Sequence, residues 1–138
     1  MRSIVLGLFA VSLWAQTAAA GEAHYACAFD SGASWNFENG KFGSDATAPL
    51  TFTIEKINRS SQKAELATKT GRSDLKMVAA IDAMHFIEVT VSGYLNLTTI
   101  YGDSGDGSAV PAVHSRHLGI VGQPLGGQMT GFCTKKSS

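Results

Sequence analysis

The chain has 138 residues, of which 44% are hydrophobic, and its 11 basic and 11 acidic side chains give a formal net charge of zero. A chain of this length is typical of one domain with its own core. Its neutrality argues against a nucleic-acid-binding protein, which needs a basic surface. It also argues against a polybasic patch that binds a membrane surface. We therefore expect a single domain with no nucleic-acid partner.

The first 20 residues have the pattern of a cleavable bacterial signal peptide. A short basic start precedes an almost wholly apolar run from Ile4 to Trp14, and Ala18-Ala19-Ala20 supplies the small residues that a signal peptidase needs. The apolar run is shorter than the roughly 20 residues that span a bilayer. We expect residues 1–20 to be removed and residues 21–138 to form one β domain without a membrane span. Export to the periplasm or beyond follows.

Two cysteines, Cys27 and Cys133, lie near the two ends of this expected mature chain. An oxidising compartment favours a disulfide, and two cysteines allow one intramolecular pairing. Two free thiols or an intermolecular bridge are the alternatives. A redox-catalytic role is not favoured, because there is no C-x-x-C pair. The bridge would join the first strand to the last.

Short stretches of alternating apolar and polar residues follow one another through the rest of the chain. The apolar positions and the turns between them are, in order, Tyr25-Cys27-Phe29, Trp35-Phe37, a turn at Asn39-Gly40, Leu50-Phe52-Ile54, a turn at Asn58–Ser61, Ala64-Leu66, Ile87-Val89-Val91 and Leu95-Leu97. Residues 110–117 and 128–134 complete the series. This spacing predicts an all-β fold, a small antiparallel β-barrel or sandwich of about eight strands closed by one disulfide.

Residues 74–84 fit two secondary structures. Met77, Ile81 and Met84 have the spacing of a helix face, with Ser73 as a possible cap. Leu75, Met77, Ala79 and Ile81 equally make one face of a strand. We favour the strand because its neighbours are strands.

The register of the hairpin around Ser92-Gly93 decides which side chains share a face. A two-residue turn would place Asn96 and Thr98 on the face of Ile87 and Val89. A three-residue loop, Ser92-Gly93-Tyr94, places Val89 opposite Leu97 and collects the aliphatic side chains together. Since a shift of one residue exchanges the two faces, we favour the odd loop, which puts Glu88 opposite Thr98.

Residues 114–117, His-Ser-Arg-His, form the densest polar cluster. On a strand, His114 and Arg116 point one way and Ser115 and His117 the other. A metal site would therefore need further ligands, such as Asp82 or His85. We expect Arg116 to pair with Glu88, with a histidine nearby, and such a group can orient a carboxylate or a phosphate. The same group can equally be a structural ion pair. The candidate ligand-binding residues are Glu88, His114, Arg116 and His117.

The Gly102–Ser108 stretch is rich in Gly, Asp and Ser. Its Gly-Asp-Ser-Gly start resembles the nucleophile segment of chymotrypsin-like proteases, but the chain is too short for that fold and Asp106 replaces the next glycine. Asp103, Ser104 and Asp106 offer oxygen ligands for calcium without the spacing of an EF-hand loop. An exposed hairpin loop is the favoured interpretation.

Several segments resemble parts of small exported proteins of proteobacteria. They are residues 85–88 (His-Phe-Ile-Glu), 97–100 (Leu-Thr-Thr-Ile), 113–117 (Val-His-Ser-Arg-His) and the closing Gln128 to Cys133. The resemblance implies export and brings no activity or site assignment. In size and expected architecture the chain is also similar to periplasmic inhibitors of C-type lysozymes.

No motif points to a reaction, a catalytic residue, a metal or a cofactor. The sequence therefore favours a non-enzymatic binding module for a small ligand or a periplasmic protein surface, with Trp35 and Phe37 as apolar walls or as plain core. One alternative is an enzyme that uses the histidines as acid–base groups or metal ligands. The other is a structural envelope protein without a ligand.

Overall fold

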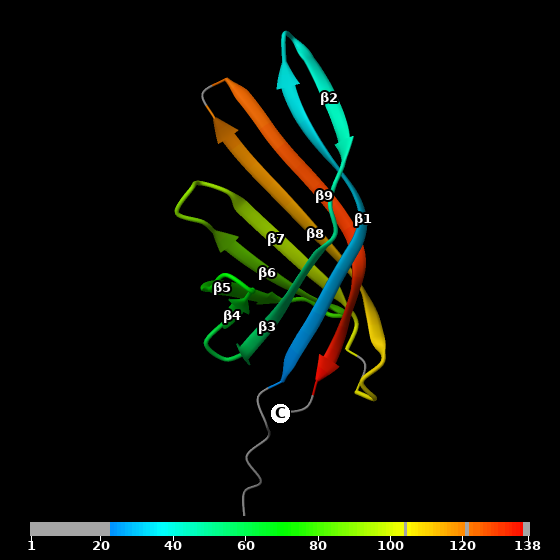
Figure 1. Cartoon of the computed structure of the whole chain (residues 1–138). Coiled ribbons are helices and arrows are strands. Elements are labelled where there is room, and N and C mark those ends of the chain that lie inside the picture. The colour runs from blue at the N-terminus through cyan, green and yellow to red at the C-terminus, as the bar shows by residue number, and fades with distance from the viewer. Residues whose placement is uncertain (1–22, 104, 121, 137–138) are drawn as a thin grey trace, which may run out of the picture.

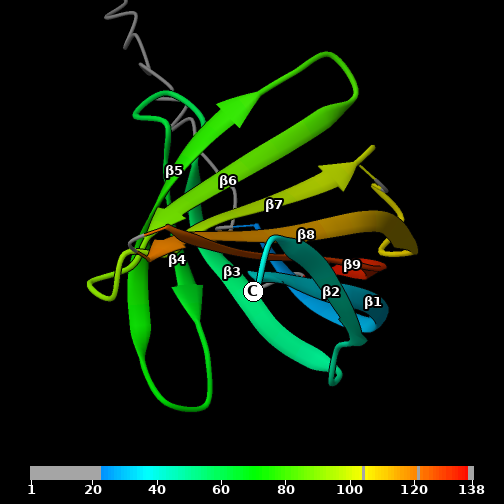
Figure 2. The same ribbon diagram turned by 90° about the horizontal axis from the view of Figure 1, so that it is seen from above.

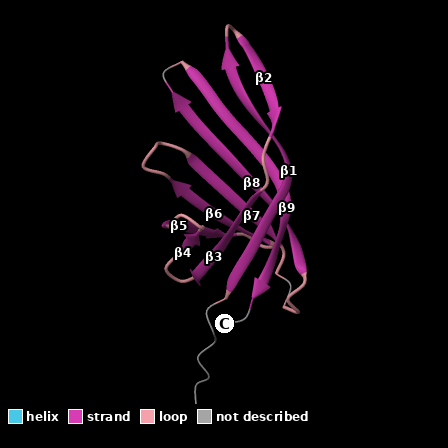
Figure 3. Ribbon diagram, viewed as in Figure 1, coloured by secondary structure: helices cyan, strands magenta, loops and turns pink. Residues whose placement is uncertain are grey.

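The computed structural model describes residues 23–103, 105–120 and 122–136. These residues form strands and turns and contain no helix (Figure 3). In chain order the strands are β1 (His24–Glu38), β2 (Lys41–Ala46), β3 (Leu50–Asn58), β4 (Lys63–Ala67), β5 (Arg72–Ala79), β6 (Ala83–Val89), β7 (Leu95–Tyr101), β8 (Ala109–Ile120) and β9 (Gln123–Lys136) (Figure 1). The expected signal peptide lies outside the described residues.

The strands form a closed antiparallel barrel of eight strands, β1 and β3 to β9, as the sequence predicts. Each strand pairs with the next around the barrel, and β9 returns to pair with β1. Seen from above, β2 continues the sheet beyond β1 at one end (Figure 2). Closure gives every barrel strand two neighbours, which removes the exposed edges of an open sheet.

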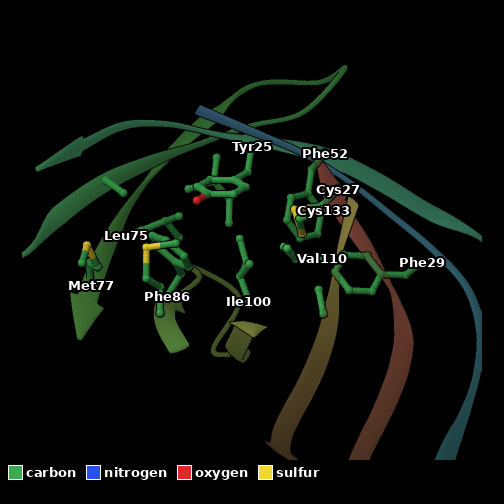
Figure 4. Packing of buried hydrophobic residues seen from close by; sticks show 14 of the residues in the cluster. Tyr25, Cys27, Phe29, Phe52, Leu75, Met77, Phe86, Ile100, Val110 and Cys133 are labelled. Atoms are coloured by element: carbon green, nitrogen blue, oxygen red, sulfur yellow. A yellow bond between two sulfur atoms is a disulfide. The ribbon is translucent and has the colours of Figure 1, made fainter. Parts of the chain in front are cut away.

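A disulfide lies at the seam between the first and last strands. Cys27 and Cys133 are register partners in the β1–β9 ladder, and their sulfur atoms are bonded with the two Cα atoms 4.0 Å apart. Both residues are buried in the barrel interior (Figure 4). This confirms the predicted bridge, and it is compatible with an oxidising, exported location.

The seam also depends on a glycine. A Cβ atom on Gly131 would lie 2.0 Å from the carbonyl oxygen of Ala28 and 2.7 Å from the Cα of Phe29. The backbones of β1 and β9 therefore come closer at this point than any side chain allows. The strands shift register next to it, between Phe29 and Ser31.

The hydrophobic core fills the end of the barrel at which β1 begins and β9 ends. Its largest fully buried side chains come from β1, β3, β5, β6, β7 and β9 and are Tyr25, Phe29, Ile54, Met77, Phe86, Ile100 and Cys133. Figure 4 shows how these side chains and their neighbours pack together. At the same end the phenol of Tyr25 donates a hydrogen bond to Asp103 (3.0 Å), and Lys135 forms an ion pair with that carboxylate (2.9 Å). These contacts fix the 102–108 loop, which the sequence correctly assigns to a connection between strands.

Residues 74–84 form strand and turn, as favoured from the sequence. Leu75 and Met77 point into the core from β5, while Ile81 lies fully exposed in the turn that leads to β6. The helix alternative is wrong.

The predicted β6–β7 register is wrong by two residues. Val89 lies opposite Leu95 and Glu88 lies opposite Asn96, because the loop is longer and spans residues 90–94. The aliphatic side chains do share one face, but that face is the outside of the barrel: Val89 is 74% exposed and Phe86, on the other face, is 1% exposed.

Candidate functional site

A row of register partners crosses the inner face of the sheet near one end of the barrel. The row runs from β2 to β6 through five successive cross-strand pairs and consists of Asp45, Ser34, Gly127, Arg116, Asn96 and Glu88. We call these six residues the polar row. Paired residues of an antiparallel ladder point to the same face, and Asn96 is only 9% exposed, which places this face inside.

The next rows inward become progressively more apolar. Along β7 the inward side chains change from Asn96 to Thr98 to Ile100, and along β8 from Arg116 to His114 to Ala112. The barrel thus has an apolar, filled end and a polar end. We call the polar end, lined by Ser34, Tyr94, Arg116 and Gly127, the mouth.

Glu88 is held by neutral partners at the mouth. The Ser73 hydroxyl donates to one of its carboxylate oxygens at 2.5 Å, and the Asn96 amide nitrogen donates to the other at 2.7 Å. No ion pair joins Glu88 to Arg116 in the described part of the chain. The predicted ion pair is therefore wrong, although both residues face the interior. The amide oxygen of Asn96 is buried and has no hydrogen-bond partner.

Arg116 lies beside an aromatic ring instead of an acid. Its guanidinium carbon is 4.7 Å from the centroid of the Tyr94 ring. No side-chain hydrogen bond joins the Arg116 guanidinium to another described residue, so its N–H donors are available for an anion. Among residues 23–103, 105–120 and 122–136, no carboxylate lies within ion-pair distance of Arg116.

His114 lies one row deeper and is 5% exposed. Its Nδ1 is 2.9 Å from the Thr98 hydroxyl, and its ring packs against Phe29 and Phe52 at centroid distances of 5.7 and 5.4 Å. Burial lowers the pKa of His114 to about 4, with the positive charge of Arg116 lowering it further and Glu88 opposing the shift. The imidazole is therefore neutral at neutral pH.

His117 is separated from the other three candidates. It follows Arg116 on β8 and lies on the outer face, opposite Leu95 of β7 and Gly126 of β9. The predicted alternation of residues 114–117 is thus confirmed: His114 and Arg116 share the inner face with Glu88, with Arg116 exposed at the mouth, while His117 faces out.

A cavity of about 600 Å³ opens at the mouth. It lies between the β1–β2 hairpin, the 46–50 segment, Tyr94 and the β8–β9 ladder. The β1–β2 hairpin projects at this end of the barrel (Figure 1). Arg116 and Gly127 of the polar row line it, together with apolar residues that include Leu50, Leu125 and Met129. This volume is in the range of small-molecule sites in proteins.

The two aromatic residues proposed as walls have different positions. Trp35 lines the cavity and its ring lies against Gly126, where a Cβ atom would be 2.5 Å from the indole. Phe37 lies further along the hairpin and packs on Phe42 with centroids 4.9 Å apart. Neither belongs to the barrel core.

The two aspartates of the 102–108 loop, Asp103 and Asp106, make structural contacts. Asp103 binds Tyr25 and Lys135, and Asp106 accepts a hydrogen bond from the backbone N–H of Ser108 at 2.9 Å. In the described segments no three His, Cys, Asp or Glu residues gather as a metal site would require. No helix within those segments is long and apolar enough to cross a membrane.

Comparisons with protein-family models, with curated proteins and with solved structures find no match for this chain.

Sequence reasoning missed four of the six residues of the polar row, namely Asp45, Ser34, Gly127 and Asn96. The local pattern of β1 and β2 contains no cluster there, and the first three of these residues meet Arg116 only through the β1–β9 and β8–β9 pairings. Asn96 could have been assigned to the inner face from the sequence, because it shares a strand face with Thr98 and with Ile100, an apolar residue expected in the core.

Proposed function

We propose that the protein is an exported, non-enzymatic binding module that holds a small anionic organic molecule in the cavity at the mouth. Arg116 anchors the anion through the edge of its guanidinium, and the apolar residues around it hold the body of the ligand. Barrels that enclose small ligands commonly bind them at an open end.

One observation carries the proposal: the cavity contains an arginine that has no acidic partner among the described residues. Arginine has five N–H donors in a planar fork that matches a carboxylate. A structural arginine in a barrel wall would be expected to pair with Glu88, which lies two strands away. Instead Glu88 is satisfied by Ser73 and Asn96, which leaves the charge of Arg116 to an incoming group.

The test is calorimetric titration of the exported, oxidised protein with a panel of small organic acids and their neutral amides. We expect one or more acids to bind and their amides to bind at least tenfold more weakly. Arg116→Gln should weaken the acids about tenfold or more, since a charge-assisted contact is worth about 1.5–3 kcal/mol.

His117→Gln is the matched control, because His117 is the next residue on β8 but lies on the outer face. The affinity of the His117→Gln protein for the acids should equal that of the wild-type protein. An Arg116→Gln protein that binds the acids as well as the wild type does, or a panel with no binder, would contradict the proposal.

A further inference from the structure

The cavity has two charged residues in its described lining, Arg116 and Asp45, and they carry opposite charges. Both belong to the polar row, at its β8 and β2 positions. Three strand spacings separate them, which corresponds to about 14 Å between their Cα atoms in a flat sheet.

The two residues that separate Arg116 and Asp45 in the polar row fill little of the space above the sheet. Gly127 has no side chain and Ser34 has a small one, so the inner face between Arg116 and Asp45 is mostly bare backbone. A Cβ atom at Gly127 would sit 3.3 Å from the carbonyl oxygen of Ala33, in the space above that backbone. The hydroxyl of Ser34 already points to a backbone group, the Asp45 carbonyl, at 3.4 Å.

Neither charge takes part in an ion pair within the described segments. The guanidinium of Arg116 lies over the Tyr94 ring. A ligand in the cavity therefore meets a positive group, Arg116, on one side and a negative group, Asp45, on the other, with the backbone of Gly127 and Ser34 between them.

We propose that the ligand of this cavity is a small zwitterion with an apolar body, of the size of an amino acid or a dipeptide. Its carboxylate binds Arg116 and its ammonium group binds Asp45, above Gly127. This inference rests on the proposed anion site and adds a cationic subsite to it.

The opposite charges of the two residues that line the cavity argue against two other classes of ligand. A ligand with two anionic groups would place the second one near Asp45, where the interaction has the opposite sign to that at Arg116. A ligand with a single anionic group would use only one of the two charges that line the cavity. A zwitterion matches both positions.

The test uses L-phenylalanine, glycyl-L-phenylalanine, N-acetyl-L-phenylalanine and L-phenylalaninamide in calorimetric or NMR titrations of the exported protein. We expect at least one of the first two, which keep both charges, to bind. The two blocked compounds should bind at least tenfold more weakly than the better of them.

Two variants separate the two ends of the site. Asp45→Asn should weaken the zwitterion at least fivefold and leave N-acetyl-L-phenylalanine unchanged, while Arg116→Gln should weaken both. Asp82→Asn, in the turn at the other end of the barrel, is the control and should change neither. Since Asp45 is exposed and its carboxylate makes no contact with a described residue, its variant should fold normally, as a thermal melt will show.

Equal binding of N-acetyl-L-phenylalanine and L-phenylalanine, with no effect of Asp45→Asn, would overturn the zwitterion and leave the anion site standing. Binding of an organic acid from the panel but of neither phenylalanine compound would do the same. Failure of all acids and all four probes would overturn both proposals.

Discussion

Glu88 and Arg116 face the same interior of the barrel, and Asn96 lies between them in the cross-strand register. Two strand spacings correspond to about 10 Å between their Cα atoms. The Glu88 carboxylate is saturated by Ser73 and Asn96. Because the Glu88 carboxylate is hydrogen-bonded to these neighbours, it does not pair with the Arg116 guanidinium, and the two charges have separate roles.

A double-mutant cycle tests this separation. Glu88→Gln, Arg116→Gln and the double variant should give a coupling free energy below about 0.5 kcal/mol, because the two side chains form no ion pair and lie about 10 Å apart at their Cα atoms. Urea unfolding measures it. The pair of Glu88→Gln and Asn96→Ala, whose side chains touch, is the positive control and should couple more strongly. A coupling above about 1.5 kcal/mol between Glu88 and Arg116 would show an ion pair in solution.

His114 should make the fold sensitive to mild acid. Its pKa in the folded protein is lowered to about 4 from 6.5, so between these values the unfolded chain binds more protons than the folded one. Stability is therefore complete above about pH 6.5 and falls as the pH decreases towards 4, by up to about 3 kcal/mol. Urea unfolding at a series of pH values measures the slope.

The matched variants for this pH dependence are His114→Phe and His117→Phe. The first should flatten the slope between pH 6.5 and 4.5, whatever its effect on absolute stability, and the second should keep it because His117 lies on the outer face. An unchanged slope in His114→Phe would mean that another group titrates in this range.

The close approach at the seam predicts a strong effect of a single methyl group. Gly131→Ala would place its Cβ 2.0 Å from the Ala28 carbonyl oxygen, so β1 and β9 must separate locally. We expect a loss of about 3 kcal/mol or more in the free energy of unfolding, at the upper end for overpacked sites. Gly71→Ala is the control, since a Cβ there has no neighbour within 4 Å. Equal stability of the two variants would contradict the tight seam.

Much of the fold could be predicted from local pattern and from the two cysteines. Period-two alternation correctly placed Tyr25, Cys27 and Phe29 inside, and the disulfide correctly joined the first strand to the last. These features depend on neighbouring residues or on a single possible pairing, which is why one sequence is enough to find them.

The orientation of β6 and β7 could not be predicted in the same way, because the more aliphatic face is the one in contact with solvent. Glu88, Asn96 and Thr98 face inward, where Ser73, Asn96 and His114 provide hydrogen bonds that offset their burial. Hydrophobicity alone assigns such strands the wrong way round. The site was therefore found only in part: Glu88, His114 and Arg116 share the interior, whereas Asp45 and Gly127 join them through pairings between strands distant in sequence.

The β9 strand pairs with both β8 and β1, and the disulfide between β1 and β9 joins cysteines 106 positions apart in the sequence. Barrel closure must therefore wait until almost the whole polypeptide is available to fold. Until then β1 presents an unpaired edge and several aromatic side chains to its surroundings, a state that invites aggregation. A fold with such non-local contacts also forms slowly. Formation of the oxidised barrel should consequently depend on a holding chaperone and on a thiol oxidant that acts late, once β9 is available to pair with β1.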